Sequence, residues 1–327
     1  MEPISRIDPK SNQLYFRGIN AIDLSRSLDY EAVLFLLVNG NTPTQSQRDT
    51  LAQKMYQLRK LYTKEIESLD SLIDRLAEYR EKLNLNLHDT LLAFVTMSTL
   101  VIANRFTKSQ SQEMREFNPE LGHVAYFLWM TKGNQISESD LADFQTALIL
   151  PMDDPDNPSL TALINALETG DEIDALHAAL KEHVGPLHHG AGTLAMKMFE
   201  EIGKPENARE YLEERLNSGS KIFGLGHRIY QGIDPRAVVL EDMLVRRTMN
   251  SSDEWIVHVS EAVAREGRTL LAMKKGIDAF PNIDLYNAAV YHTFGFPPEF
   301  NTSLFAVSRA AGWMAHILEL KSQSIDS

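Results

Sequence analysis

The sequence predicts an all-α protein of about two domains. Apolar residues recur at helical spacing along most of the chain, and the segments between these stretches are short, which is typical of helix-on-helix folds. The length of 327 residues corresponds to about two domains at roughly 150 residues each. Hydrophobic residues at 43% and charged residues at 24% are ordinary for a chain with a sizeable core.

The first eighteen residues form the one stretch without helical spacing. Ile4, Ile7, Leu14 and Phe16 alternate loosely across a polar turn at 9–12, which predicts a short hairpin or an extended arm.

Helical spacing begins at Tyr30 and continues almost to the end. The run from Tyr30 to Val38 is closed by Asn39-Gly40, a typical helix stop, and Thr44 is a plausible cap for the next helix. The segment His88–Phe106 is apolar on most sides, which predicts a buried central helix. Further helices are expected at 46–61, 66–83, 121–130, 139–150, 160–167, 173–183, 193–202, 208–218, 235–248, 255–266, 285–294 and 303–320.

Composition excludes several classes of function. The net charge of −13 argues against binding to a nucleic-acid backbone, although it leaves room for a local basic pocket. The absence of cysteine excludes disulfides, thiol nucleophiles and cysteine-ligated zinc, and it favours a cytoplasmic location. No apolar run approaches 18 residues and no signal-peptide pattern opens the chain, so we expect no membrane segment.

The first candidate motif is Gly185-Pro186-Leu187-His188-His189-Gly190-Ala191-Gly192. A histidine at such a helix entrance can protrude into a cleft, and an ordinary turn histidine explains the pattern equally well. The adjacent His188 and His189 share no helix face, so a metal site is not expected.

The second motif contains Gly224-Leu225-Gly226-His227 and Asp234-Pro235-Arg236. The Asp-Pro pair is a good start for a helix and places Arg236 in its first turn, where free amides and the helix dipole already favour an anion. The glycines let the backbone approach a ligand closely. The third glycine of a dinucleotide fingerprint is missing, and a capped helix with a surface arginine remains the alternative.

The third motif is Pro281-Asn282-Ile283-Asp284, where Asp284 taken alone is best explained as a helix cap. Arg309 is more informative, because it lies in an almost uncharged helix and its guanidinium must be paired there. The partner is either a protein carboxylate or a ligand carboxylate. The small residues around Arg309 also permit close helix packing, so a structural role stays open.

Taken in this order and spacing, the motifs resemble the citrate synthase family, which includes the 2-methylcitrate synthases. The resemblance covers nearly the whole chain and begins at Leu14-Tyr15-Phe16-Arg17-Gly18. Each further motif alone is weak, but four in order make the resemblance specific. They are Gly185-Pro186-Leu187-His188, Gly226-His227-Arg228-Ile229-Tyr230 with Asp234-Pro235-Arg236, Pro281-Asn282-Ile283-Asp284, and Ser308-Arg309-Ala310-Ala311-Gly312-Trp313.

The resemblance implies an all-α homodimer whose chains have a large helical domain (1–188 and 285–327) and a small one (189–284). The active site would lie in the cleft between them and close by domain rotation. The family, which serves the tricarboxylic acid cycle, joins the methyl carbon of acetyl-CoA to the carbonyl of oxaloacetate and hydrolyses the thioester. The implied partners are therefore an acyl-CoA and a 2-oxo acid, with no metal, no other cofactor, no nucleic acid and no membrane.

The resemblance also assigns roles to single residues. Asp284 would remove the α-proton as a general base made more basic by burial, His188 would hydrogen-bond the thioester oxygen, and His227 would polarise and then protonate the ketone oxygen. Arg236 and Arg309 would hold the substrate carboxylates. The loop with Lys221, Gly224, Leu225 and Gly226 resembles the stretch whose backbone meets the CoA adenine.

The chain departs from the family pattern near the oxo-acid site. Two family histidines that follow a Leu-Ile-Leu helix end have no counterpart in Pro151–Ser159. The one that binds oxaloacetate falls at Asp154, whose charge would repel a dianion. His189 is the nearest candidate in sequence to replace it. The family's C-terminal Arg-Pro segment is absent from this sequence. Elsewhere His189 and Gly192 replace a glycine and a frequent asparagine, while Asn287-Ala288 replace Ser-Gly.

These departures leave alternatives to a working synthase. One is an impaired paralogue that binds CoA esters or an active partner subunit. Another is a citryl-CoA lyase type of enzyme, because the same residues serve retro-Claisen chemistry. The intact catalytic residues favour the synthase, with either the family's substrates or an altered oxo acid or acyl chain.

Overall fold

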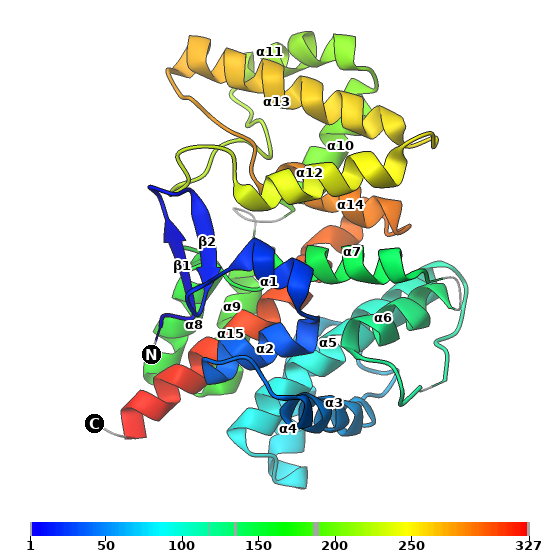
Figure 1. The fold of residues 1–327 in the computed structure, drawn as a ribbon, viewed down its shortest axis with the longest axis vertical. Helices are drawn as coiled ribbons and strands as arrows, with labels where there is room; N and C mark the ends of the chain where they lie inside the picture. The colour runs from blue at the N-terminus through cyan, green and yellow to red at the C-terminus, as the bar shows by residue number, and fades with distance from the viewer. Residues whose placement is uncertain (1, 117, 134–135, 186–189, 326–327) are drawn as a thin grey trace. The chain divides into compact units, whose positions relative to one another are not determined.

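The computed structural model describes residues 2–116, 118–133, 136–185 and 190–325. Within these ranges the chain forms fifteen α-helices, three 3₁₀ turns and one small three-stranded sheet (Figure 1). The expected all-α class is confirmed, and the described strands all lie within the first twenty residues.

The strands are β1 (Ser5–Asp8), β2 (Gln13–Phe16) and β3 (Ile19–Asn20), in the order β1-β2-β3. The predicted hairpin is therefore confirmed.

The helices follow in an unbroken series. They are α1 (Ala21–Ser27), α2 (Tyr30–Asn39), α3 (Gln45–Arg59), α4 (Leu69–Leu83), α5 (Leu87–Ser109), α6 (His123–Lys132), α7 (Glu138–Ile149), α8 (Pro158–Thr169), α9 (Glu172–Val184), α10 (Ala191–Ile202), α11 (Ala208–Asn217), α12 (Pro235–Thr248), α13 (Glu254–Lys275), α14 (Asn287–Thr293) and α15 (Asn301–Ile325), with the 3₁₀ turns η1 (Pro205–Asn207), η2 (Ile283–Leu285) and η3 (Pro298–Phe300).

The predicted helix ends agree with the capping chemistry that the structure shows. Gly40 ends α2 in the left-handed conformation, with φ of 78°, where glycine carries no side-chain penalty. Thr44 caps α3 in a reciprocal capping box with Gln47. The Asx cap of α1 at Asn20 was not predicted, because α1 is too short to show a helical period.

The helix α13 runs well past its expected end at Glu266. The next residue, Gly267, reads as a stop in sequence, but it lies buried in the helix. A Cβ at Gly267 would lie 2.5 Å from Cδ1 of Leu225, so the glycine lets the Leu225 side chain pack closely against α13.

The chain divides into two compact units. Unit 1 consists of Met1–Arg6, Tyr15–Leu187 and Ser303–Ser327, and unit 2 consists of Ile7–Leu14 and His188–Thr302. The resemblance predicts a small domain of residues 189–284 that rotates against a large domain formed by the rest of the chain. These domain bounds stay a prediction.

Unit 1 is built around α5, which packs against α3, α4 and α6. By length and composition α5 could cross a membrane, yet 94% of its most apolar window is buried in the protein, as in a core helix. The predicted buried central helix is therefore confirmed. Trp313 of α15 is fully buried in the same core, where its indole N–H donates to Ser159 Oγ at 3.2 Å.

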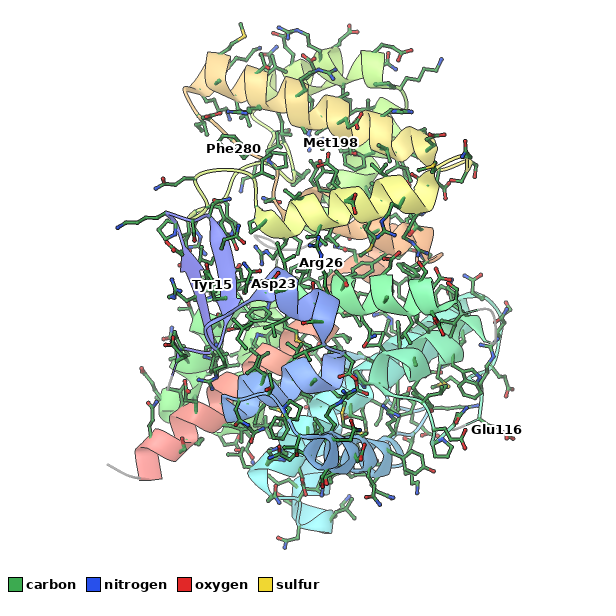
Figure 2. All side chains as sticks on the ribbon, in the orientation of Figure 1. Tyr15, Asp23, Arg26, Glu116, Met198 and Phe280 are labelled. Carbon is green, nitrogen blue, oxygen red and sulfur yellow. The ribbon has the colours of Figure 1, made fainter. Side chains whose placement is uncertain are left out.

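Unit 2 is built from α10 to α14, with α13 packed on α11 and α12 packed on α14. Met198 of α10, labelled in Figure 2, is among the buried side chains that fill this unit. The two connections that carry the candidate residues, 221–234 and 276–286, join these helices.

Candidate active site

Arg236 is held by a buried carboxylate two residues away. Its Nε and Nη2 donate to Oδ1 and Oδ2 of Asp234 at 3.0 and 2.8 Å, which is a forked pair. Asp234 is 0% and Arg236 1% exposed, so the alternative of a surface arginine is wrong. Asp234 also caps α12, as predicted, by accepting from the Arg236 amide at 2.9 Å.

Asp234 joins the start of α12 to the segment that carries Asp284. Its backbone N–H donates to Pro281 O at 3.0 Å, and its Oδ2 accepts from the Ile283 amide at 3.2 Å. Asn12, at the hairpin turn, holds the preceding residues by donating from Nδ2 to Ile233 O at 2.6 Å. One aspartate thereby positions both an arginine and the candidate base segment.

Asp284 lies within the 3₁₀ turn η2 and does not cap it. The cap is Asn282, whose Oδ1 accepts from the Asp284 amide at 2.9 Å, so the interpretation of Asp284 as a bare helix cap is wrong. Two residues later, the buried Tyr286 donates its hydroxyl to Glu241 Oε1 at 2.9 Å. Burial and then the Glu241 charge raise the pKa of Tyr286 above its usual value, which keeps this hydroxyl a donor.

The Gly224–Gly226 loop is paired with the segment before Asp284. Gly226 N donates to Phe280 O at 2.7 Å, and Asn282 N donates to Gly224 O at 2.9 Å. Asn282 Nδ2 adds a bond to Gly226 O at 2.7 Å. At Gly224 a Cβ would lie 2.6 Å from the Leu285 Cα, and φ is +79°, so this position requires glycine on both grounds.

The start of this loop, at Lys221, is exposed to solvent, whereas Leu225 is packed. Lys221 is exposed, and its carbonyl accepts from Arg215 Nε at 3.0 Å, which fixes the start of the loop to α11. Leu225 forms an isolated bridge with Pro281 and packs at Gly267. The four candidate CoA residues therefore belong to a stretch whose backbone is held from both sides.

His227 has its ring orientation set by the backbone. Its Nδ1 accepts from the amides of Ile229 at 3.1 Å and Tyr230 at 3.3 Å. Since an amide can only donate, Nδ1 carries the lone pair, and the neutral ring bears its proton on Nε2. Nε2 is therefore the atom through which His227 can donate a proton.

Tyr230 connects His227 to Arg236. Its ring centroid lies 4.5 Å from the His227 ring, and the Arg236 guanidinium carbon lies 5.6 Å from the Tyr230 centroid. Unit 2 thus brings together four of the sequence-predicted features in one bonded network: the glycine loop, His227, Arg236 and the turn with Asp284.

Arg309 belongs to unit 1 and is 1% exposed. Its guanidinium carbon lies 5.3 Å from the Phe305 ring centroid. The Arg309 charge helps to lower the pKa of Asp153, so this carboxylate lies close enough to interact with the guanidinium.

Asp153 is fully buried and is contacted by two other segments of unit 1, the strand β1 and the helix α15. Its Oδ2 accepts from Ser5 Oγ at 2.5 Å and lies 2.9 Å from His316 Nε2. Burial alone would raise the pKa of Asp153, but the charge and hydrogen bond of His316, the charge of Arg309 and the Ser5 bond together hold the pKa below its usual value. The absence of a side chain at Gly312 gives Asp153 room beside α15, since a Cβ at position 312 would lie 2.6 Å from Asp153 Oδ1.

Asp154, which the sequence singled out, is also buried, and its Oδ1 accepts from the Asp156 amide at 3.2 Å. That Asp154 opposes an oxo acid stays a prediction. His188 and His189 lie outside the described residues. No group of three or more histidine, aspartate or glutamate side chains that could hold a metal occurs among the residues the structure describes.

Sequence reasoning missed the supporting residues Asp153, Asn282 and Tyr230, and it recognised only the capping role of Asp234. An Asp-Pro-Arg run does contain a usable signal, because an aspartate at a cap and an arginine two residues later can reach each other. Asp153 gave no such signal, because Ser5, His316 and Arg309 approach it from distant parts of the chain.

Comparisons with known proteins identify the family of this chain. The family model "Citrate synthase, C-terminal domain" matches residues 2–325. Citrate synthase 2 of Bacillus subtilis strain 168 is 31% identical over 94% of this chain and 86% of its own length. 2-Methylcitrate synthase 1 of Corynebacterium glutamicum is 27% identical over 97% of this chain and 87% of its own length.

The fold is shared as well. The crystal structure of citrate synthase from Thermotoga maritima MSB8 superposes with a TM-score of 0.83 at 28% identity, covering 98% of this chain and 88% of that one. A family match over nearly the whole chain, together with this fold, shows that the protein belongs to the citrate synthase family and is an acyltransferase of that type.

Proposed function

We propose that the protein condenses acetyl-CoA, or another short acyl-CoA, with oxaloacetate or a related 2-oxo acid and then hydrolyses the thioester. The observation that carries this proposal is the network around Asp234, which joins Arg236, the Asp284 turn and, through Asn282, the glycine loop. A carboxylate base, an anion-binding arginine and an open backbone loop are the parts that such a condensation needs. No observation favours the impaired paralogue or the lyase over the synthase.

In the proposed first step Asp284 removes a proton from the α-carbon of the acyl thioester. His188 would donate a hydrogen bond to the thioester oxygen as the enolate charge develops there. The enolate carbon then bonds to the ketone carbon of the oxo acid, and His227 gives its Nε2 proton to the ketone oxygen. Water then cleaves the C–S bond, which yields the free tricarboxylic acid and CoA thiol. Positioned acid–base groups of this kind are typically worth about 10²–10⁴-fold.

The geometry of His227 supports its part in that step. Two backbone donors at Nδ1 favour the neutral ring and leave Nε2–H as the donor. His227 can therefore act as an acid in its neutral form, without a protonated imidazole. Arg236 supplies the positive charge for a substrate carboxylate. Arg309 would hold a second carboxylate, while the backbone of Lys221, Gly224, Leu225 and Gly226 would meet the CoA adenine.

A thiol-release assay tests the proposal. We expect CoA thiol to appear from acetyl-CoA or propionyl-CoA when one member of a panel of 2-oxo acids is present, without an added metal or other cofactor. No release with any acid, at enzyme concentrations where the fold is intact, would contradict it.

Asp154 bears on which oxo acid is used. If its carboxylate faces the substrate at about 4 Å, the repulsion is on the order of 4 kcal/mol at an effective dielectric of about 20. We therefore expect a high KM for oxaloacetate, or a co-substrate with fewer charges, and Asp154→His should lower that KM. If His189 replaces the lost histidine instead, His189→Gly should raise KM and Asp154→His should change nothing. Tight oxaloacetate binding that neither variant alters would refute both versions.

We also propose that the protein acts as a homodimer in the cytoplasm, in the tricarboxylic acid cycle, with no nucleic-acid or membrane partner. A closed two-fold pairing is the commonest assembly, and the family resemblance implies one. Light scattering checks the dimer, since a particle of 36.9 kDa at micromolar concentration would contradict it.

A further inference from the structure

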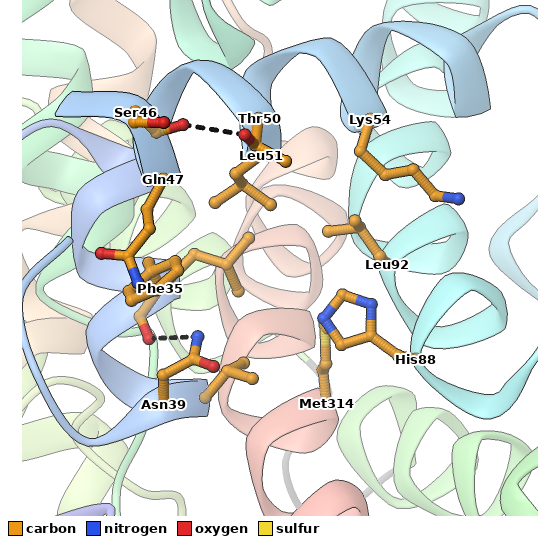
Figure 3. A pocket seen from close by; sticks show the side chains of 12 residues that line it. Phe35, Asn39, Ser46, Gln47, Thr50, Leu51, Lys54, His88, Leu92 and Met314 are labelled. Carbon is orange, nitrogen blue, oxygen red and sulfur yellow. Dashed lines mark hydrogen bonds between the residues drawn. The ribbon is translucent and has the colours of Figure 1, made fainter. Parts of the chain in front are cut away.

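Unit 1 contains a cavity of about 260 Å³ between α2, α3, α5 and α15 (Figure 3). One wall is apolar and consists of Leu34, Phe35, Val38, Leu92 and Met314. None of the residues to which a role in the reaction is assigned lines this cavity. It is therefore a separate feature that the proposed function does not use.

The opposite wall is the first half of α3, where the lining residues Ser46, Gln47 and Thr50 are exposed to solvent. Residues 46, 47, 50, 51 and 54 lie on one face at helical spacing, a pattern that is normally apolar. Here only Leu51 is apolar, while Ser46, Gln47, Thr50 and Lys54 are polar. The cavity therefore has a mostly polar wall on α3 opposite an apolar wall.

The charges around the cavity are basic. Of the twelve lining residues, Lys54 and His88 are the titratable ones, and both are basic when charged. Figure 3 shows Lys54 and His88 on one side of the cavity, with Gln47 and Asn39 on the other. Asp89 lies outside the lining but faces both groups. It accepts from Lys54 Nζ at 2.6 Å, which uses one of the three ammonium donors, and its Oδ1 lies 3.6 Å from His88 Nδ1, so the head group would bind through the donors that Asp89 leaves available.

We propose that this cavity binds a straight-chain carboxylate of about eight carbons, with the tail along the apolar wall and the carboxylate at Lys54 and His88. The apolar wall selects a hydrocarbon chain, and the basic pair selects a negative head group. The size agrees, because an apolar cavity of about 150 Å³ holds one benzene molecule and this one is larger.

Calorimetric titration of the full chain with hexanoate, octanoate and 1-octanol tests the proposal. Each added methylene that is buried should tighten binding about fourfold, so octanoate should bind about tenfold to twentyfold more tightly than hexanoate. Octanol, which lacks the charge, should bind more weakly than octanoate. Lys54→Met should weaken octanoate about tenfold and leave octanol unchanged. Equal binding of octanoate and octanol by the unmodified protein would overturn the assignment of the head-group site.

Two matched variants of α3 locate the binding. Thr50→Phe places a ring in the cavity from an exposed position and should abolish octanoate binding, while Gln53→Phe makes the same change at an exposed position outside the lining and should not. Circular dichroism checks that both variants fold. Binding that survives Thr50→Phe, or no saturable binding by the unmodified protein up to about 10 mM, would overturn the proposal. Neither result depends on the proposed reaction, because no assigned reaction residue is changed.

Discussion

Each unit of the molecule buries one of the two proposed substrate arginines together with one aspartate, but the two arrangements differ. In unit 2, Asp234 and Arg236 are two residues apart and form a forked pair within one helix start. In unit 1, Asp153 lies near Arg309 but is bonded to Ser5 and His316, from opposite ends of the chain. The first arrangement is local and depends on one motif, whereas the second exists only when three distant segments are packed.

This difference determines how the stability of each unit should respond when its aspartate is removed. Removing Asp234 leaves a buried guanidinium without its forked partner, and such a loss is usually costly. Removing Asp153 affects Ser5, His316 and Arg309 together, and its effect depends on the charges that hold the pKa of Asp153 low. We therefore expect the larger effect in unit 2 and a more pH-dependent effect in unit 1.

The largest expected effect is that of Asp234→Ala. It should lower the free energy of unfolding by about 3–5 kcal/mol, because Arg236 stays buried without its carboxylate and α12 loses its cap. Urea denaturation measures the loss. The control is Asp242→Ala on the same helix, whose exposed ion pair with Arg246 should contribute less than about 1 kcal/mol. Equal losses of unfolding free energy in the two variants would show that the buried pair contributes no more to stability than the exposed pair.

Asp153→Asn should have a smaller effect that changes with pH. The pKa of Asp153 is lowered in the folded protein, so its ionised form stabilises the fold at pH values above its ordinary pKa of 3.8, and this stabilisation is lost as the pH falls through the lowered value. The stability difference between the unmodified protein and Asp153→Asn should therefore be constant near neutrality and shrink below pH 4. Thermal unfolding of both proteins across this range measures it, and a difference that grows on acidification would contradict the assignment.

Gly312→Ala tests the packing that admits Asp153. A glycine inside a helix is ordinarily destabilising by about 0.5–1 kcal/mol relative to alanine, so the substitution should stabilise an unconstrained helix. Here the new Cβ would lie 2.5 Å from Met152 O and 2.6 Å from Asp153 Oδ1, so we expect a loss of about 1–3 kcal/mol instead. Denaturant unfolding gives the sign directly, and a gain in stability would mean that the loop moves aside at little cost.

The same comparison explains how much could be predicted from the sequence. Helical spacing, the Gly40 stop and the Thr44 cap were sufficient to predict most helices, because these signals are local. The buried state of Arg309 was also predictable, since an arginine in an apolar helix requires a carboxylate.

The parts that could not be predicted depend on register and on distant contacts. Asp153 and Asp154 are neighbours in one loop, and the sequence alone does not tell which of them turns toward Arg309. Asp284 and Asn282 are both good caps, and only the path of the η2 turn decides that Asn282 is the acceptor. Gly267 reads as a helix end because its packing partner, Leu225, is far away in the chain.

The most direct test of the proposed chemistry is exchange of the acetyl-CoA α-protons in deuterated buffer, with the oxo acid or a non-reacting analogue of it bound. The unmodified protein should incorporate deuterium, and Asp284→Asn should abolish the exchange while circular dichroism and CoA binding stay unchanged. Asp278→Asn, which removes an exposed carboxylate six residues earlier that pairs with Arg268, should exchange like the unmodified protein. Normal exchange by a folded Asp284→Asn protein would contradict the central claim that this carboxylate is the base.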